Sequence, residues 1–260
     1  MNWRMVDEGW GRRAVDFATL LEPSSVREYL FVHQRLGVAA GTRLLDVACG
    51  AGLAIELAAL RGADCAGIDA SSRLVEVARL RNPNADIRVG DMAESGFEAD
   101  SFDVVTSFRG IWGTTPEAVL EAYRVLRPGG RLALTFWGDM AATPGGRLLA
   151  PLGLATTDQV AHQSRMVALK RPGAAAAFLA EAGLLPGELF AVPFVLEFAD
   201  LEHYARALSS SGPAYEAIRA AGEPAFRTAC EEAAAPFVRD GRPIRAELSL
   251  FGIEGLKPAT

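Results

Sequence analysis

The sequence predicts a doubly wound α/β fold with a mostly parallel, seven-stranded sheet and an antiparallel pair of strands in its C-terminal part. Between residues 42 and 137, short apolar runs rich in β-branched residues alternate with amphipathic stretches. This alternation is typical of successive βα units. Two later runs, 188–198 and 244–256, alternate apolar and polar residues as antiparallel strands do.

The expected elements of the parallel region follow one another along the chain. Apolar runs predict strands at 43–48, 64–68, 86–89, 102–107 and 131–137, and helices between them at 53–61, 72–81 and 116–126. Ser71 or Ser72 is a suitable N-cap for the second helix, and Pro116 suits the first position of the third. Pro128 and the glycines after it end the third helix before the last strand.

Composition narrows the functional class. A net charge of -6 argues against nucleic acid as a partner, because that binding depends on clustered Lys and Arg.

No apolar run approaches the ~20 residues that span a bilayer and nothing resembles a secretory leader, so we expect a cytoplasmic protein. Cys49, Cys65 and Cys230 are widely spaced and odd in number, which fits neither disulfides nor a metal site. We expect a small-molecule partner and a monomer or homodimer.

The strongest local signal is the run Leu44–Gly52, an apolar strand that leads into a turn of small residues. Small residues allow a ligand to approach the backbone. A dinucleotide-binding loop would have glycines at 48, 50 and 53, where this chain has Ala48, Gly50 and Leu53. Asp46 would repel a pyrophosphate but attract a sulfonium and an ammonium group. The loop therefore favours S-adenosylmethionine over a nicotinamide cofactor.

Further polar residues follow the next two strands. Asp69 ends the second strand, where a carboxylate can accept hydrogen bonds from both hydroxyls of a ribose. Asp91 and Met92 follow the third strand. Open α/β sheets bind ligands at this carboxyl edge, so we expect the adenine ring of a cofactor there.

Together these motifs resemble the class I S-adenosylmethionine-dependent methyltransferases, in particular the branch of the ubiquinone and menaquinone biosynthesis enzymes. The similar segments are LLDVACGAG at 44–52, Asp69, GDM at 90–92, FDVVTSF at 102–108 and RVLRPGGRLALTF at 124–136. Several motifs in one order are more specific than any single one. The resemblance implies a Rossmann-like methyltransferase fold that transfers a methyl group to oxygen, carbon or nitrogen of a small acceptor, such as a quinone precursor or a secondary metabolite, with S-adenosylhomocysteine as product.

The resemblance also implies roles for single residues. Gly50 and Gly52 would approach the methionine part of the cofactor, and Asp69 would hold the ribose. The full set expected to contact the cofactor is Asp46, Ala48, Gly50, Gly52, Asp69, Ala70, Asp91, Met92, Ser107 and Phe108. Ala48 departs from the family, in which many members have glycine, and alanine would be strained if this position requires a positive φ.

We expect one methyltransferase domain over residues 1–260. Within it, residues 1–41 would form a helical cover, 42–137 the cofactor-binding core, and 138–171 and 200–242 insertions on the substrate side. Such insertions vary between relatives and would shape the acceptor pocket.

The family has no universal catalytic residue, because the sulfonium is already a strong electrophile and alignment can supply most of the catalysis. The histidines are His33, His162 and His203, and an imidazole can accept a proton from a phenol or hydroxyl nucleophile. We prefer His162, which lies in the first insertion, while His33 lies in a helix that can simply pack. The expected acceptor pocket consists of Trp10, Arg109, Trp112 and Trp137.

Other functions remain open at this stage. The protein could bind the cofactor and catalyse a different reaction, such as a cyclisation. It could also be an inactive binding or scaffold module, to which Ala48 and the lack of an obvious base would point, or less readily a nicotinamide dehydrogenase. The Asn-Pro-Pro-Tyr signature of amino-group methylases is missing after the fourth strand, where the chain reads Thr106-Ser107-Phe108-Arg109.

Overall fold

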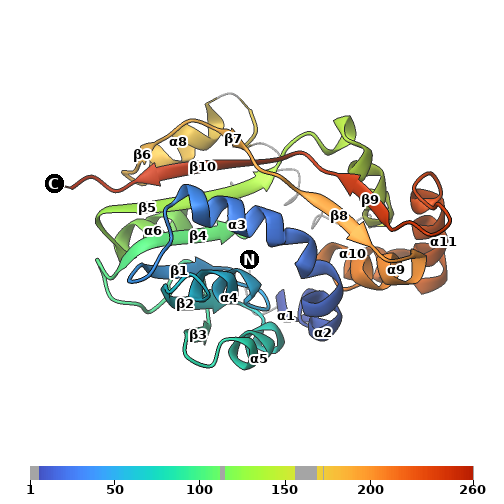
Figure 1. Ribbon diagram of the computed structural model, residues 1–260, viewed down its shortest axis with the longest axis horizontal. Helices are drawn as coiled ribbons and strands as arrows, with labels where there is room; N and C mark the ends of the chain where they lie inside the picture. The colour runs from blue at the N-terminus through green and yellow to red at the C-terminus, as the bar shows by residue number, and fades with distance from the viewer. Residues whose placement is uncertain (1–5, 112–114, 156–168, 172, 260) are drawn as a thin grey trace.

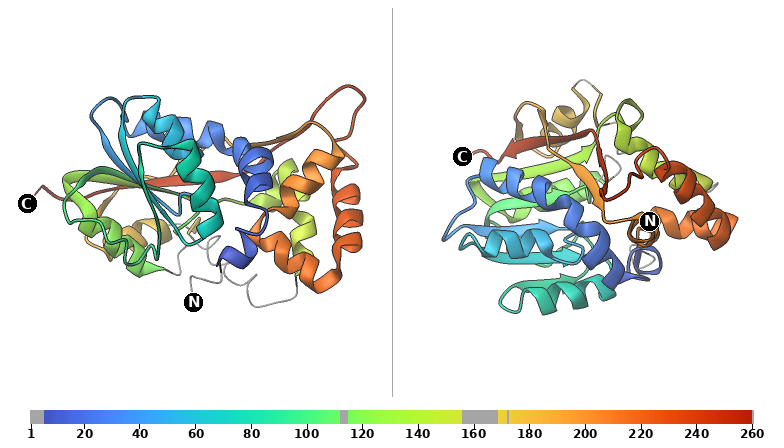
Figure 2. Two further views of the ribbon diagram at one scale, coloured as in Figure 1. Left: turned by 90° about the horizontal axis from the view of Figure 1, so that it is seen from below. Right: turned by 45° about the vertical axis from the view of Figure 1, so that its right-hand side comes forward.

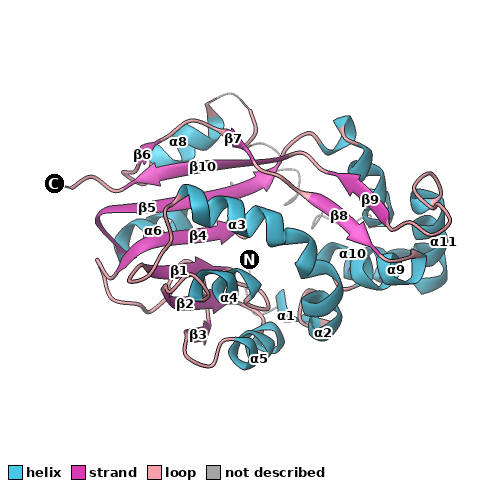
Figure 3. Ribbon diagram, in the orientation of Figure 1, coloured by secondary structure: helices cyan, strands magenta, loops and turns pink. Residues whose placement is uncertain are grey.

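The computed structural model describes residues 6–111, 115–155, 169–171 and 173–259. These residues form a central sheet covered by helices and a smaller C-terminal lobe beside it (Figures 1 and 3). No helix in the described ranges combines the length and the apolar character needed to cross a membrane.

The strands of the central sheet lie in the order β3-β2-β1-β4-β5-β10-β6, and β7 also pairs with β10. Their bounds are β1 (Arg43–Val47), β2 (Asp64–Asp69), β3 (Asp86–Val89), β4 (Phe102–Phe108), β5 (Leu126–Trp137), β6 (Leu185–Pro186), β7 (Phe190–Ala191) and β10 (Leu250–Leu256). The first five strands pair in parallel. β10 is antiparallel to β5, β6 and β7. The carboxyl ends of the five parallel strands therefore meet at one edge.

Helices cover both faces of this sheet. They are α3 (Val26–Arg35), α4 (Leu53–Ala59) and α5 (Ser72–Arg81) on one face, and α6 (Pro116–Val125) and α8 (Ala174–Ala180) on the other. Adjacent residues of a strand point to opposite faces. Accordingly Leu44 packs with Val32 and Ile55, whereas Leu45 packs in the cluster that contains Val119 and Phe178.

The C-terminal lobe has an apolar core of its own. It consists of η5 (Pro144–Leu154), β8 (Val195–Phe198), α9 (Leu201–Ser209), α10 (Gly212–Ala221), α11 (Glu223–Ala234) and β9 (Ile244–Glu247), with the short η4 (Met140–Ala142) leading into it. β8 and β9 form a separate antiparallel sheet. Trp137, at the end of β5, packs against the sheet core and the lobe core alike, so it marks their joint.

Four short helices at the N-terminal end join the two parts. We call them the N-terminal segment, residues 6–25: α1 (Val6–Gly9), α2 (Ala14–Asp16), η2 (Phe17–Leu21) and η3 (Glu22–Ser25). α1 contacts α10, η2 contacts α9, and α2 contacts α5. Figure 2 shows these helices between the sheet and the helices of the lobe.

The predicted fold class is confirmed, with differences of detail. β5 begins at Leu126 instead of residue 131, because Leu126 pairs with Phe102 ahead of the turn. Within the described residues the central sheet has eight strands, where seven were expected. The antiparallel run 188–198 is divided at Pro193, which lacks an N–H for a ladder, so β7 joins the central sheet and β8 pairs with β9.

Candidate functional site

A turn of small residues joins β1 to α4 at the carboxyl edge of the sheet. Ala48, Gly50 and Gly52 all have positive φ, of 59°, 55° and 78°. This conformation costs about 1–2 kcal/mol for a residue with a Cβ atom. A Cβ at Gly52 would lie 2.9 Å from the Cβ of Ala78 on α5. The positive φ thus favours glycine at both positions, and the nearby Ala78 leaves no space for a side chain at Gly52. Ala48 has the backbone strain that the sequence analysis considered for an alanine with positive φ.

Asp69 ties this loop to the end of β2. Its Oδ2 accepts from the N–H of Gly50 at 2.9 Å, and its Oδ1 accepts from the N–H of Ser71 at 2.8 Å. Burial raises the pKa of Asp69, and these backbone hydrogen bonds oppose that rise. Ala70 beside it is half-buried. The acid thus lies beside the glycine loop, where a ribose partner was predicted.

Asp46 is buried beneath the same loop. Its Oδ1 accepts from the hydroxyl of Thr106 at 2.7 Å. Burial raises the pKa of Asp46 to about 8, despite this hydrogen bond and with added repulsion from nearby carboxylates. At neutral pH the carboxyl group is therefore largely protonated, and a cation placed above it would favour loss of that proton.

The end of β4 is fixed to its neighbours. The hydroxyl of Ser107 donates to the carbonyl of Val47 at 2.8 Å and accepts from the N–H of Ile111 at 3.0 Å. The ring of Phe108 meets the edge of the Tyr29 ring, with centroids 4.6 Å apart. These two predicted cofactor contacts therefore hold β4 against β1 and against α3.

Asp91 and Met92 lie in a tight turn after β3. The carboxylate of Asp91 accepts from the N–H of Ala93 at 2.9 Å, and Met92 packs against the apolar cluster that contains α6 and α8. Both side chains are half-buried at the carboxyl edge of the sheet.

Arg109 follows β4 and is held by an acid from α3. Its Nη2 lies 2.8 Å from Oε2 of the fully buried Glu28 and donates to the hydroxyl of Ser25 at 2.6 Å. Thr135 donates to the other oxygen of Glu28 at 2.5 Å. The backbone of Arg109 is also strained, with φ of 58°. Ser25 and Glu28 thus hold the guanidinium directly, and Thr135 holds Glu28 in place.

Aromatic rings surround the same guanidinium. The ring centroids of Trp137 and Phe194 each lie 5.0 Å from the Arg109 side chain. Of the expected acceptor pocket, Arg109 and Trp137 are therefore in contact. Trp10 lies elsewhere, against Phe17 of η2 and close to Gly212 of α10. Trp112 and His162 fall outside the described residues.

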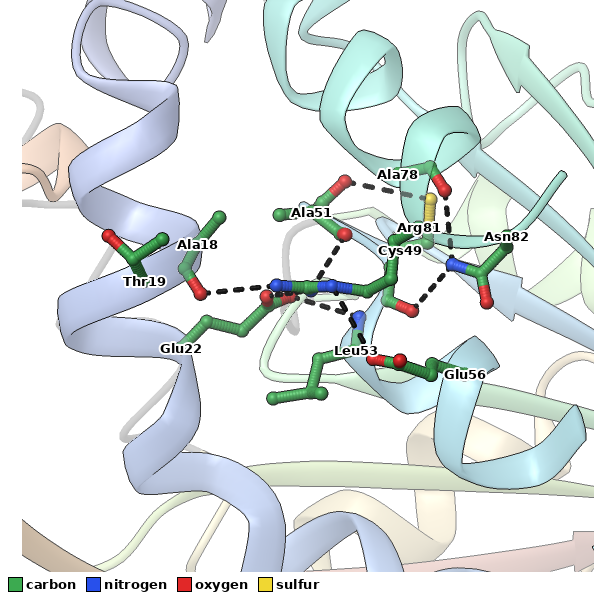
Figure 4. Close-up of polar contacts among 12 residues, drawn as sticks. Ala18, Thr19, Glu22, Cys49, Ala51, Leu53, Glu56, Ala78, Arg81 and Asn82 are labelled. Carbon is green, nitrogen blue, oxygen red and sulfur yellow. Dashed lines mark hydrogen bonds and ion pairs between the residues drawn. The ribbon is translucent and has the colours of Figure 1, made fainter. Parts of the chain in front are cut away.

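A second buried ion pair was not predicted from the sequence. Glu22 of η3 is 2% exposed, and its Oε2 lies 2.5 Å from Nη1 of Arg81, the last residue of α5. Figure 4 shows Arg81 between the N-terminal segment and the glycine loop. Burial raises the pKa of Glu22 to about 7, although Arg81 opposes the rise.

The comparisons with known proteins place the core of this site in a family. Residues 45–134 match the family model described as a methyltransferase domain. We refer to these residues as the methyltransferase domain, after the description of that family model. They include the five parallel strands, apart from the start of β1 and the end of β5, and the glycine loop, Asp69 and Ser107.

Curated relatives of this methyltransferase domain occur in quinone biosynthesis. A ubiquinone biosynthesis O-methyltransferase of Pseudomonas savastanoi pv. phaseolicola is 32% identical over 153 residues, which are 55% of this chain and 63% of that protein. A demethylmenaquinone methyltransferase of Renibacterium salmoninarum is 36% identical over 101 residues, 38% of this chain and 43% of that protein. The chain thus spans less than two thirds of the length of these relatives.

Solved structures share the fold of the methyltransferase domain. The YcgJ protein from Bacillus subtilis has a TM-score of 0.56 at 20% identity, over 89% of this chain and 98% of that one. The [4+2]-cyclase SpnF has the same TM-score and identity, over 89% and 80%. The phosphoethanolamine N-methyltransferase 2 of Haemonchus contortus, in complex with phosphomonomethylethanolamine and S-adenosylhomocysteine, has a TM-score of 0.61 at 18% identity, over 99% and 60%.

The other histidines lie in structural surroundings. His33 is fully buried beside the Phe108 ring, and neither ring nitrogen has a hydrogen-bond partner among the described residues. Burial, with the nearby Arg61, lowers its pKa to about 4, so it stays neutral. His203 accepts through Nδ1 from the N–H of Ala199 near the start of α9. Both histidines have roles in packing or in local hydrogen bonding.

The edge of the methyltransferase domain holds more acids than bases. Besides burial, the neighbouring carboxylates Glu22, Asp69 and Glu28 raise the pKa of Asp46. The buried or partly buried ionisable groups described there are the carboxyl groups of Glu22, Glu28, Asp46 and Asp69 and the guanidiniums of Arg81 and Arg109. A ligand that carries positive charge would favour the ionised form of Glu22 and Asp46, whose pKa values are raised.

Proposed function

We propose that this protein transfers a methyl group from S-adenosylmethionine to a small-molecule acceptor and releases S-adenosylhomocysteine. The observation that carries the proposal is the glycine loop braced by Asp69 above a surplus of buried carboxylates. A sulfonium cation suits this surplus, whereas a pyrophosphate does not. The names of the curated relatives support a quinone precursor as acceptor, with a secondary metabolite as the other candidate, and with oxygen, carbon or nitrogen as the methylated atom.

The residues at the edge of the sheet fit this cofactor. Gly50 and Gly52 would border its methionine part, Asp69 and Ala70 its ribose, and the turn of Asp91 and Met92 its adenine. Asp46, Ala48, Ser107 and Phe108 would complete the surroundings. When bound, the cofactor supplies an electrophilic methyl group, so the task of the chain is to orient both ligands and to exclude water.

The acceptor would lie beside Arg109, on the side away from the cofactor. Because Glu28 balances the charge of Arg109, the wall made with Trp137 and Phe194 suits an uncharged ring better than an acid. His162 is the proposed base, with Trp112 as a further acceptor contact. Replacing His162 by alanine should abolish turnover and leave cofactor affinity unchanged.

Calorimetric titration with S-adenosylmethionine, S-adenosylhomocysteine and NAD tests the cofactor. We expect micromolar binding of the first two and none of NAD. If neither of the first two binds, the enzymatic proposal fails and an inactive scaffold becomes the better interpretation. Size-exclusion chromatography would test the predicted monomer or homodimer, and fractionation of cells the predicted cytoplasmic location.

The pH dependence of binding tests the role of the buried acids. At pH 7 Glu22 is about half protonated and Asp46 largely protonated, because burial raises their pKa values to about 7 and about 8. A bound sulfonium lowers both pKa values, so protons leave and affinity rises between about pH 6 and 9, by up to about tenfold per pH unit for each proton released. S-Adenosylhomocysteine lacks the sulfonium charge and should release fewer protons. Titration in buffers of different ionisation enthalpy measures the difference, and equal release by both ligands would contradict this role.

A cyclisation is the second candidate function. It is favoured by the likeness in fold to the [4+2]-cyclase SpnF. Product analysis separates the two: a methylated product with S-adenosylhomocysteine supports methyl transfer, and an isomerised product with intact cofactor supports cyclisation.

A further inference from the structure

The ion pair of Glu22 and Arg81 contacts the glycine loop on several atoms. Oε1 of Glu22 accepts from the N–H of Leu53, the first residue of α4, at 3.3 Å. Nη1 of Arg81 donates to the carbonyl of Ala51 at 2.8 Å. The neighbouring Asn82 donates to the carbonyl of Gly52 at 3.0 Å. Groups from η3 and from the end of α5 therefore fix the loop together.

The same pair contacts the N-terminal segment. Arg81 donates through Nη2 to the carbonyl of Ala18 in η2 at 3.2 Å, and Glu22 itself belongs to η3. Figure 4 shows both contacts on one guanidinium. Movement of the N-terminal segment away from the sheet therefore requires the loss of hydrogen bonds that also shape the glycine loop.

The N-terminal segment covers the loop. A Cβ built at Gly50 would lie 3.3 Å from Cε1 of Phe17 and 3.7 Å from Oε1 of Glu22. At this distance Phe17 closes Gly50 on this side, so a ligand that reaches Gly50 from here must displace Phe17. Because Phe17 belongs to η2, exchange of such a ligand requires the segment to move.

The ion pairs between the segment and the lobe are more exposed than this pair. Asp16 pairs with Arg206 and Arg13 with Glu223, and the side chains of Arg206 and Glu223 are 53% and 61% exposed. Exposed pairs contribute little to stability, whereas loss of one partner from a buried pair is costly. The side chain of Glu22 is 1% exposed and that of Arg81 19%. This pair is therefore the stronger candidate for controlling the position of the segment.

We propose that Glu22 and Arg81 are positioning residues that latch the N-terminal segment over the bound cofactor and limit the rate at which it is released. The inference rests on the proposed function, because that function places the methionine part of the cofactor at Gly50. The latch would act through the loop and the segment, so the chemistry of methyl transfer does not require it.

Release of S-adenosylhomocysteine from immobilised protein, followed by surface plasmon resonance, tests the latch. The variants are Glu22→Gln, which removes the charge, and Arg81→Lys, which keeps the charge but loses the forked geometry of the guanidinium. The matched control is Asp100→Asn, which removes the charge from the 2.6 Å pair with Lys257 ahead of β4, at the opposite edge of the sheet. Amide hydrogen exchange and melting temperature are measured on the same proteins.

We expect both latch variants to release the ligand at least about tenfold faster and to exchange faster in residues 6–25, with unchanged exchange in β4 and β5. Asp100→Asn should release the ligand at the parent rate. If both latch variants bind normally and release the ligand at the parent rate, the latch is overturned but the proposed function is not. An equally faster release from Asp100→Asn would also overturn the latch. If the unaltered protein binds neither cofactor form, the proposed function fails and the latch fails with it.

Discussion

The methyltransferase domain and the C-terminal lobe use buried polar groups differently. At the edge of the domain, Asp46, Asp69 and Glu28 bury carboxylates that are costly to desolvate. The lobe buries Glu216, which pairs with the exposed Arg219, but it packs mainly around Tyr204, whose hydroxyl donates to the carbonyl of Leu148 at 2.6 Å, and around residues such as Phe226. Buried ionisable groups with shifted pKa values are enriched at functional sites, so this difference favours the domain edge over the lobe as the place of the proposed chemistry.

Two glycines with similar φ, one in each part, also differ in their surroundings. Gly50 has φ of 55° and lies under Phe17, whereas Gly241, in the turn before β9, has φ of 68° and no atom within 4 Å of a built Cβ. The backbone requirement is shared, but only Gly50 has its side-chain space taken. Substitutions at matched positions in the two parts can therefore separate strain from loss of ligand space.

The largest effect is expected for Gly50→Val. The branched side chain would meet Phe17 and fill the space proposed for the methionine part, so S-adenosylmethionine affinity should fall at least about 100-fold, which is about 3 kcal/mol. Gly241→Val shares the backbone strain of about 1–2 kcal/mol but should bind normally. Calorimetry and chemical denaturation measure both quantities. Normal binding by Gly50→Val would show that the cofactor lies elsewhere.

A smaller effect on binding is expected for Asp69→Ala. This change removes the acceptor of the Gly50 N–H and the proposed ribose partner, so affinity should fall by about 1–3 kcal/mol. The matched change in the lobe is Asp200→Ala, which removes the N-cap that accepts from the N–H of His203. It should lower stability by about 1 kcal/mol and leave affinity unchanged. Equal affinities for the two variants would contradict the role of Asp69.

Tyr204→Phe is expected to affect stability alone. Loss of its hydroxyl leaves the carbonyl of Leu148 without this donor in a buried position, so the free energy of unfolding should fall by about 1–2 kcal/mol. Cofactor affinity should match that of the unaltered protein. A matching loss of affinity would show that the lobe shapes the cofactor site, contrary to the division drawn above.

The smallest effect is expected for Ala48→Gly. Relief of strain at φ of 59° contributes about 1–2 kcal/mol, and the greater freedom of glycine in the unfolded chain offsets about 0.4–1 kcal/mol of it. We expect a net gain in stability of up to about 1.5 kcal/mol, measured by urea denaturation. A decrease would show that the methyl group of Ala48 packs favourably.

Local patterns in the sequence were sufficient for much of the domain. The strand around Leu45, the small residues of the loop and the acid Asp69 are recognised from neighbours within a few residues, and the structure brings the loop and Asp69 into contact. The end of the second helix at Arg81 was also predicted correctly. Such features depend on hydrophobic periodicity and turn chemistry, both of which are short-range.

The pairing of distant charges could not be predicted in this way. Glu22 and Arg81 are 59 residues apart, and Glu28 and Arg109 are 81 apart. No periodicity relates such positions. A weaker signal for the second pair was the position of Glu28 beside Tyr29 on the buried side of a helix, where an acid requires a partner. The roles of His162 and Trp112 stay predictions, because both lie outside the described residues.

The position of β10 has a consequence for how the chain folds during synthesis. β10 fills the gap between β5 and β6, so residues 250–256 must leave the ribosome before the outer side of β5 is paired. Until then β5 is an unprotected edge strand, which can pair with other chains. A nascent chain that stalls after β5 would therefore be prone to aggregate, and chaperones would be needed most during synthesis of the lobe.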